Sequence, residues 1–229
     1  MALDESLLYS EDSPATLRTY RWDPAGLSLG YFQHGGPFRD LEGDHVLVRR
    51  ITGGGAIFHQ DEITFSLSVN ADLLPQQVDQ SYELIHSAIG AALRDVGVET
   101  QVPRDKRPTG RPRPDNPWCF AEPVDIDLVT PEGKKILGSA QRRINRPRRV
   151  LHQGSLVLRA PRATPMCGAL ADQVDPESVE QSLETALSER IGSALGLRPR
   201  VGSLRASERI RAQELVDTRY GSPAFTCRR

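Results

Sequence analysis

Three consecutive glycines separate two apolar runs in RRITGGGAIFHQDEITFSL, which spans residues 49–67. Glycine weakens a strand but frees the φ angle, so Gly53, Gly54 and Gly55 indicate a place where the backbone comes close to something. Backbone N–H groups in such a turn can point at a carbonyl or phosphate oxygen, and Arg50 and His59 bring charge and hydrogen bonds nearby. The segment predicts a ligand-binding turn, and a tight bend between two strands is the alternative.

Two common phosphate-binding motifs do not fit this segment. A P-loop requires GxxxxGK[ST], and a dinucleotide-binding turn requires GxGxxG at the start of a helix. Here the glycines lead into a second strand-like run at residues 63–69. The segment therefore favours neither nucleotide-binding motif.

Cys119 is a second candidate for chemistry, because it follows a polar loop where solvent access is expected. A lone cysteine is more often a small buried apolar residue than a nucleophile. Lysine, however, is scarce: the 29 basic residues include only Lys106, Lys134 and Lys135. An ammonium group is a compact charge that suits a catalytic role better than a guanidinium group does. Since side chains alternate along a strand, only one of Lys134 and Lys135 can face a pocket.

Small residues follow this lysine pair at Gly138, Ser139 and Ala140. On a strand they would leave room for a thin apolar chain to lie along the backbone. A surface hairpin with ordinary charged ends is the alternative interpretation of the same residues.

Hydrophobic periodicity predicts strands interspersed with helices around one pocket. Tyr31 and Phe32 end one predicted strand, and we expect both aromatic rings to pack in the core. The length of 229 residues favours a single domain. The predicted helices cover residues 2–10, 77–96, 179–191 and 207–219, and the predicted strands include 17–22, 27–32 and 63–69.

Residues 104–117, RDKRPTGRPRPDNP, contain four prolines and many charges. Such a composition is typical of an exposed loop rather than of a helix or strand. A solvated loop is the plain interpretation. Collectively, its basic side chains could dock an acidic protein partner.

Composition argues against several classes of protein. The net charge of −1 is unlike that of an electrostatic nucleic-acid binder. No apolar run approaches the roughly 18 residues of a membrane span. The three cysteines lack CxxC spacing and the five histidines are scattered, so neither a disulfide framework nor a metal site is expected. This cysteine usage fits a reducing cytoplasm.

The glycine segment resembles the signature of the biotin/lipoate protein ligase and acyltransferase superfamily, which reads RRxTGGGAVFHxxxLTYSL. WDPAGLSLGYFQ, at residues 22–33, is similar to a second family element, WxPPxLSLGYFQ. The resemblance covers residues 1–225. It implies an α+β fold in which a mixed β-sheet is flanked by helices, like the catalytic core of biotin protein ligases. It also implies one catalytic domain over residues 1–229.

The segment that begins at Cys119 resembles the cysteine-dependent octanoyltransferases of Gram-positive bacteria, which carry CFxxPSxYEL…GKKIxGSAQ. Lys135 follows Cys119 by 16 residues (135 − 119), close to that pattern. The resemblance implies that Cys119 takes an octanoyl group from octanoyl-acyl carrier protein as a thioester and passes it to a lysine of an apo-lipoyl domain. Lys135 would favour the thiolate and stabilise the oxyanion.

The same resemblance implies further partners and site residues. The acceptor would be a lipoyl domain of a 2-oxoacid dehydrogenase or the glycine cleavage H protein. Neither ATP, another cofactor, a metal, nucleic acid nor a membrane is required. The implied substrate-binding residues are Arg50, Gly53, Gly54, Gly55, His59, Gly138, Ser139 and Ala140.

Three departures from the family pattern keep alternatives open. VDID at residues 124–127 replaces SxYE, so the contacts made by those family side chains do not carry over. LHQGS replaces LQHGS, which on a strand turns the imidazole of His152 to the opposite face, so we assign His152 no catalytic role. Cys167, in PMCG, resembles the PCG of another octanoyltransferase branch and competes with the favoured Cys119. Cys227 lies too close to the end of the sequence to be favoured as the nucleophile.

The alternative functions are an ATP-dependent lipoate-protein ligase, a lipoyl or octanoyl amidotransferase, and a non-catalytic nucleic-acid-binding module.

Overall fold

Five antiparallel strands form the larger of two sheets in the computed structural model, which describes residues 1–36, 38, 45–103 and 116–228. Strand β5 (Glu62–Asn70) shows why the sheet forms: every second residue of a strand faces the same side, and Ile63, Phe65 and Leu67 all face the main core. The strand order is β1 (Ala15–Tyr20), β5, β8 (Arg148–Val157), β7 (Lys135–Asn145) and β6 (Leu128–Val129).

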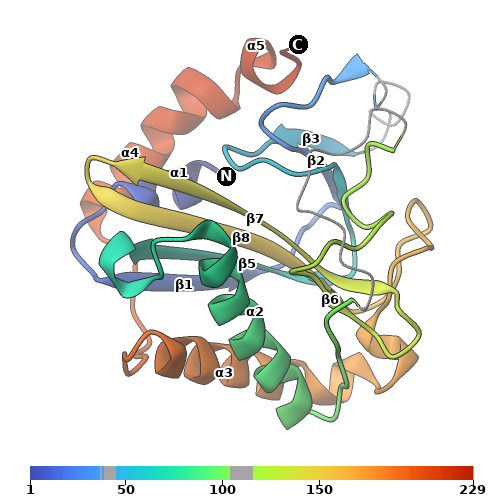
Figure 1. The fold of residues 1–229 in the computed structure, drawn as a ribbon. Helices are drawn as coiled ribbons and strands as arrows, with labels where there is room; N and C mark the ends of the chain where they lie inside the picture. The colour runs from blue at the N-terminus through green and yellow to red at the C-terminus, as the bar shows by residue number, and fades with distance from the viewer. Residues whose placement is uncertain (37, 39–44, 104–115, 229) are drawn as a thin grey trace.

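Two long helices, α2 (Val78–Asp95) and α3 (Pro176–Ala194), pack against each other and cover one face of this sheet (Figure 1). Each presents an apolar stripe at helical spacing, for example Ile85 and Ile89 on α2 and Leu187 on α3. Burial of these stripes against the sheet supplies most of the core, as the periodicity predicts.

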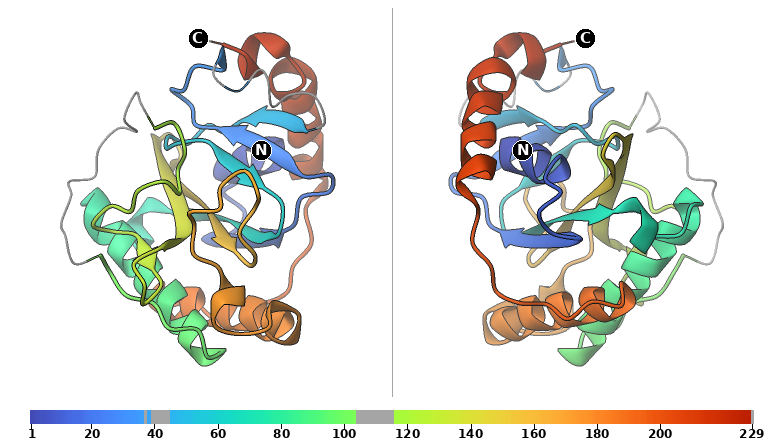
Figure 2. Two further views of the ribbon diagram at one scale, coloured as in Figure 1. Left: turned by 90° about the vertical axis from the view of Figure 1, so that its right-hand side faces the viewer. Right: turned by 90° about the vertical axis from the view of Figure 1, so that its left-hand side faces the viewer.

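The opposite face of the large sheet meets helix α1 (Ala2–Leu8) and a second sheet of three strands, and α4 (Ala206–Leu215) packs on α1 (Figure 2). Strand β2 is parallel to β3 and antiparallel to β4. The predicted α+β class, with a mixed sheet flanked by helices, is confirmed, and the strands are divided between two sheets. The order in the small sheet is β3 (Val46–Arg49), β2 (Gly26–Leu29) and β4 (Ile57–His59).

The predicted strand at residues 27–32 ends early, at Leu29. A Cβ atom on Gly30 would lie 2.0 Å from the carbonyl oxygen of Gly54, so the chain turns where the two backbones meet. Phe32 is therefore at a turn and 83% exposed, and Tyr31 is half-buried. The prediction that Phe32 packs in the core is wrong.

The remaining elements are short. After α4 the chain continues as one turn of π-helix, Val216–Tyr220, and then as α5 (Pro223–Thr226). Two 3₁₀ turns occur at Ala71–Leu73 and Leu170–Asp172. Most of the predicted basic loop, residues 104–115, lies outside the described residues. Within the described part of the chain, no helix combines the length and the apolarity needed to cross a membrane.

Candidate active site

A small pocket between the two sheets contains the half-buried side chain of Cys119. Strands β7 and β8 form one wall, and β4 with the glycine turn forms the other. Seven of the predicted site residues line this pocket: Arg50, Gly54, His59, Cys119, Gly138, Ser139 and Ala140. The other lining residues are Met1, Ile57, Thr64, Gln153, Gly154 and Ser155.

Backbone pairing places Cys119 against the glycine turn. The Cys119 N–H donates to the Ala56 carbonyl at 2.9 Å, and the Ala56 N–H donates to the Pro117 carbonyl at 2.8 Å. A Cβ atom on Gly138 would lie 3.0 Å from the Cys119 sulfur. The sulfur therefore packs directly against β7 at Gly138.

The three glycines of the turn meet different constraints. Gly54 has a φ of +91°, which L side chains rarely adopt. A Cβ atom on Gly55 would lie 2.7 Å from the Cys119 nitrogen, whereas a Cβ atom on Gly53 would meet no atom within 4 Å. Gly55 is thus required by the close approach of the cysteine segment, and Gly54 by the backbone conformation.

Arg50 holds the glycine turn through its backbone. Its buried guanidinium group donates to the carbonyl oxygens of Gly55 at 2.7 Å and Gly53 at 3.2 Å, and also to the Ser28 carbonyl at 2.9 Å. Burial lowers the pKa of Arg50. These contacts fix the turn and place a positive charge in the pocket wall beside Cys119.

Lys135 is buried beside the sulfur, whereas Lys134 is exposed. The Lys135 ammonium group lies 2.7 Å from a carboxylate oxygen of Asp127, and it also interacts with Cys119. Burial alone would lower the pKa of Lys135, but the charges of Cys119 and Asp127 raise it above its ordinary value. A permanent cation therefore lies next to the sulfur.

His59 belongs to a buried chain of hydrogen bonds. Its Nδ1 lies 2.5 Å from Glu62 and its Nε2 lies 2.6 Å from the Ser28 hydroxyl, so protein groups engage both ring nitrogens. Burial raises the pKa of Glu62, but the charge of His59 and hydrogen bonds from His59, Ser155 and Thr64 outweigh burial and lower it. The ring is fixed at the pocket wall rather than free to turn toward a ligand.

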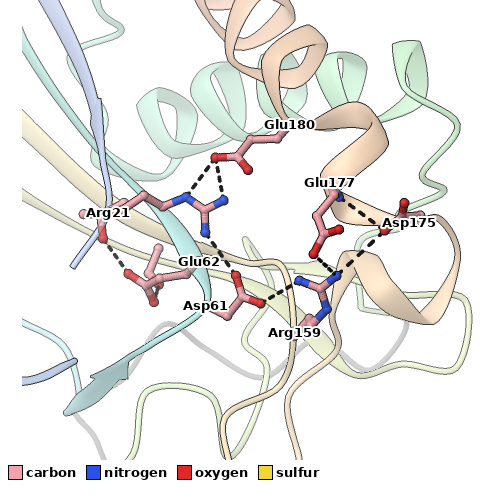
Figure 3. Close-up of polar contacts among 9 residues, drawn as sticks. Arg21, Asp61, Glu62, Arg159, Asp175, Glu177 and Glu180 are labelled. Atoms are coloured by element: carbon pink, nitrogen blue, oxygen red, sulfur yellow. Dashed lines mark hydrogen bonds and ion pairs between the residues drawn. The ribbon is translucent and has the colours of Figure 1, made fainter. Parts of the chain in front are cut away.

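Ion pairs outside the pocket anchor the turn between His59 and Glu62 (Figure 3). Arg21 and Arg159 both bind Asp61, at 3.0 and 2.9 Å. Arg21 also reaches Glu180 at 2.5 Å, and Arg159 reaches Glu177 at 3.2 Å. Both glutamates belong to α3, so the β4–β5 turn is tied to the helical layer.

Ser139 connects the pocket to helix α2. Its hydroxyl lies 2.7 Å from Nε2 of His86, and Nδ1 of the same ring contacts the Ile126 carbonyl. Burial lowers the pKa of His86. His152 lies on this helical side of the sheet, hydrogen-bonded to Gln141 at 2.9 Å, and does not line the pocket.

The other two cysteines have different environments. Cys167 is 2% exposed, its thiol donates to the Thr164 carbonyl at 2.9 Å, and burial raises its pKa. Cys227 is exposed near α5. No group of three or more His, Cys, Asp or Glu side chains among the residues with described positions could hold a metal ion.

Comparison with known proteins places the chain in a family. Residues 1–195 match the model of the lipoyl protein ligase A/B catalytic domain. The chain belongs to this family. It is 34% identical to octanoyltransferase LipM of Kyrpidia tusciae, over 94% of the chain and 89% of the relative. It is 30% identical to octanoyltransferase LipM of Symbiobacterium thermophilum, over 100% of the chain and 93% of the relative. The predicted superfamily and enzyme class, an acyltransferase of octanoyltransferase type, are confirmed.

Solved structures of lipoate protein ligases share the fold. A lipoate-protein ligase A bound with ATP superposes with a TM-score of 0.80 at 21% identity, covering 99% of this chain and 92% of that one. A bi-partite lipoate protein ligase from Thermoplasma acidophilum gives a TM-score of 0.77 at 19% identity, covering 99% of this chain and 89% of that one.

Sequence reasoning missed several groups around the pocket. Asp127 stood in the VDID departure, and it reaches Lys135 only through the pairing of β6 with β7. Glu62 follows His59 by three residues across a tight turn, which was the available signal. Trp22, whose ring stacks on His59 with centroids 4.1 Å apart, carried no such signal.

Proposed function

We propose that the chain transfers an octanoyl group from octanoyl-acyl carrier protein to a lysine of an apo-lipoyl domain, through a thioester on Cys119. The relatives named octanoyltransferase LipM support octanoyl transfer in lipoate biosynthesis as the activity of this chain. The acceptor would be a lipoyl domain of a 2-oxoacid dehydrogenase or the glycine cleavage H protein.

The first step exchanges one thioester for another. The Cys119 thiolate attacks the carbonyl carbon, a C–S bond to Cys119 forms, and the C–S bond to the carrier breaks. The carrier thiolate leaves and takes a proton from solvent. Activation of the acyl group is retained, so no ATP is consumed.

The second step moves the acyl group to nitrogen. The neutral amine of the acceptor lysine attacks the Cys119 thioester, a C–N bond forms and the C–S bond breaks. The amine proton passes to the released Cys119 sulfur. Lys135 would face negative charge in both steps, on the oxygen of each tetrahedral intermediate.

The observation that supports this proposal most is the placement of a buried ammonium group between Asp127 and Cys119, with Gly138 under the sulfur. A cation that is held by a carboxylate keeps its charge near the sulfur, where it can stabilise negative charge that develops during the reaction. The missing side chain of Gly138 lets the Cys119 sulfur and the Phe120 ring pack directly on β7.

Intact-mass analysis after incubation with octanoyl-acyl carrier protein, without ATP, tests the proposal. Wild type and the Cys167→Ser variant should gain one octanoyl group, and the Cys119→Ser variant should gain none. Addition of an apo-lipoyl domain should then remove the adduct and increase the mass of the lipoyl domain.

Other outcomes identify the alternatives. Absence of the adduct, with lipoyl-domain modification only when ATP and free lipoate or octanoate are supplied, would indicate a ligase. Acylation from an octanoyl-lipoyl domain but not from the acyl carrier protein would indicate an amidotransferase. An adduct that is lost only in Cys167→Ser would move the nucleophile to Cys167.

A further inference from the structure

A group of aromatic and basic side chains lies at the surface beside the pocket, and we call it the rim patch: the exposed Phe32 and the half-buried Tyr31, Arg142 and Arg228. Phe32 is 83% exposed, and its ring meets that of Tyr31 edge to face with centroids 5.0 Å apart. The guanidinium carbons of Arg228 and Arg142 lie 3.6 and 5.4 Å from the centroid of the Tyr31 ring. Two cations thus lie against the half-buried Tyr31 ring, and the exposed Phe32 ring packs against the same tyrosine.

The rim patch is attached to both sides of the candidate active site. The Tyr31 N–H donates to the Thr52 carbonyl at 2.8 Å, next to the glycine turn. The side chain of Gln33 donates to the Pro117 carbonyl at 2.8 Å, two residues before Cys119.

Strand β7 connects the rim patch to the pocket. Gly138 and Ala140 line the pocket, and Arg142 is the next residue on the same face, because side chains two apart share a face. Its guanidinium group also donates to the Ile51 carbonyl at 3.1 Å. A macromolecule bound to the rim patch would therefore contact the strand that lines the pocket of Cys119.

The charge of the rim patch is unbalanced. Neither Arg142 nor Arg228 forms an ion pair with a carboxylate of the residues that the structure describes. The hydrogen bond and the charge of Arg228 lower the pKa of Tyr31. Aromatic and arginine side chains are the types that dominate binding energy at protein interfaces. Free positive charge selects an acidic partner surface and speeds the encounter with it.

We infer that the rim patch docks the acyl-donor carrier protein, by contacts between Phe32 and an apolar spot and between the two arginines and acidic side chains. The inference rests on the proposed function, because it assigns a surface to the donor of that reaction. The donor thioester has to reach a half-buried sulfur, so seating its carrier on segments that contact Pro117 and the glycine turn shortens the search for Cys119. Docking would speed the encounter of the carrier with Cys119, and it would not change the rate of the thioester exchange itself.

Single-turnover acylation of Cys119, followed by intact mass, separates docking from chemistry when two donors are compared. One donor is octanoyl-acyl carrier protein, and the other is the octanoyl thioester of a small thiol, N-acetylcysteamine. Phe32→Ala and Arg142→Glu should slow acylation by the carrier about tenfold or more. Both variants should acylate from the small thioester within about twofold of wild type.

Matched changes elsewhere on the surface control for general effects. Val201→Ala and Arg200→Glu alter an exposed apolar and an exposed basic residue between α3 and α4. Both should leave the carrier reaction unchanged. Salt should slow the carrier reaction of wild type more than that of Arg142→Glu, because a docking charge has been removed.

Three outcomes would overturn the inference. Equal losses with both donors would assign the residues to the chemistry, and no loss with the carrier would remove any docking role. Normal acylation followed by slow transfer to the lipoyl domain would assign the rim patch to the acceptor. Failure of wild type to form an adduct from either donor would instead contradict the proposed function.

Discussion

The Lys135 ammonium group lies 2.7 Å from the Asp127 carboxylate, and both side chains are buried beside Cys119. A buried ion pair of this kind adds little net stability, since desolvation offsets the attraction. Its effect here is on charge: Asp127 and Cys119 raise the pKa of Lys135 although burial opposes them. The pair therefore keeps a cation at the sulfur.

Replacing Lys135 should separate its structural effect from its chemical effect. Lys135→Met leaves the buried Asp127 carboxylate with the Val124 N–H but without a cation, and should cost about 3–5 kcal/mol of unfolding free energy. The double variant Lys135→Met/Asp127→Leu removes both charges and should recover most of that loss. Acylation of Cys119 should fall about 10²–10³-fold in both variants, as when an oxyanion-stabilising group is removed. Urea unfolding and single-turnover acylation measure the two quantities.

The double variant decides the role of the lysine. If it acylates at the wild-type rate, Lys135 only supports the fold around the pocket. Continued slow acylation by a protein of wild-type stability would support a role for its charge in the reaction.

Glu62 should make stability depend on pH in the acid range. Burial raises its pKa, but the charge and hydrogen bonds of its partners lower it below the ordinary value. A depressed folded pKa contributes stability above the unfolded pKa of about 4.3, and this contribution is lost as the pH falls through the folded pKa. Wild type should therefore lose more unfolding free energy than Glu62→Gln between about pH 5 and about pH 3. Urea titrations across this range would contradict the prediction if the two proteins lost stability in parallel.

Two neighbouring glycines should respond differently to alanine. A Cβ atom on Gly55 would lie 2.7 Å from the Cys119 nitrogen, so Gly55→Ala has to move the cysteine segment away from the turn. Gly53→Ala adds its methyl group to open space and should have the smaller effect. Displacement of about 1 Å can cost about 100-fold in rate, so Gly55→Ala should slow acylation by about that factor. Comparable rates for the two variants would show that the backbone contact does not position Cys119.

Several features of the site could be predicted from sequence because they depend on local geometry. Strand alternation required that only one of Lys134 and Lys135 point inward, and the glycine run predicted a close backbone approach. The prediction for Phe32 failed because the turn that exposes it depends on contact between Gly30 and Gly54, which are far apart in sequence. Such tertiary contacts leave no periodic pattern in one sequence.

The partner of Lys135 was missed for a similar reason. Asp127 belongs to an irregular segment before β6, and only pairing of β6 with β7 brings it to the lysine. Spacing alone does not show which of several acidic residues will be placed there. The family resemblance did not help, because VDID departs from the family pattern at this point.

The buried guanidinium group of Arg49 should be one of the most sensitive positions in the chain. Its guanidinium group joins the turn that carries Tyr31 and Phe32 to the segment around α5, because it donates hydrogen bonds to carbonyl groups in both. Each buried carbonyl that loses its partner costs about 1–3 kcal/mol. The main acceptors are the carbonyls of Gly30 at 2.9 Å, Gln33 at 2.7 Å, Phe225 and Thr226 at 3.1 Å each, and Arg228 at 3.0 Å.

Arg49→Lys keeps the charge but offers three donors from one point, which cannot reproduce the planar fork of five. We expect it to lower the unfolding free energy by at least about 2 kcal/mol. The matched variant Arg148→Lys, at an exposed ion pair with Asp72, should change it by less than about 1 kcal/mol. Urea unfolding measures both, and hydrogen exchange should show faster opening of residues 223–228 in Arg49→Lys alone. Equal stability of the two variants would mean that the carbonyl groups find other donors and that Arg49 does not hold the turn.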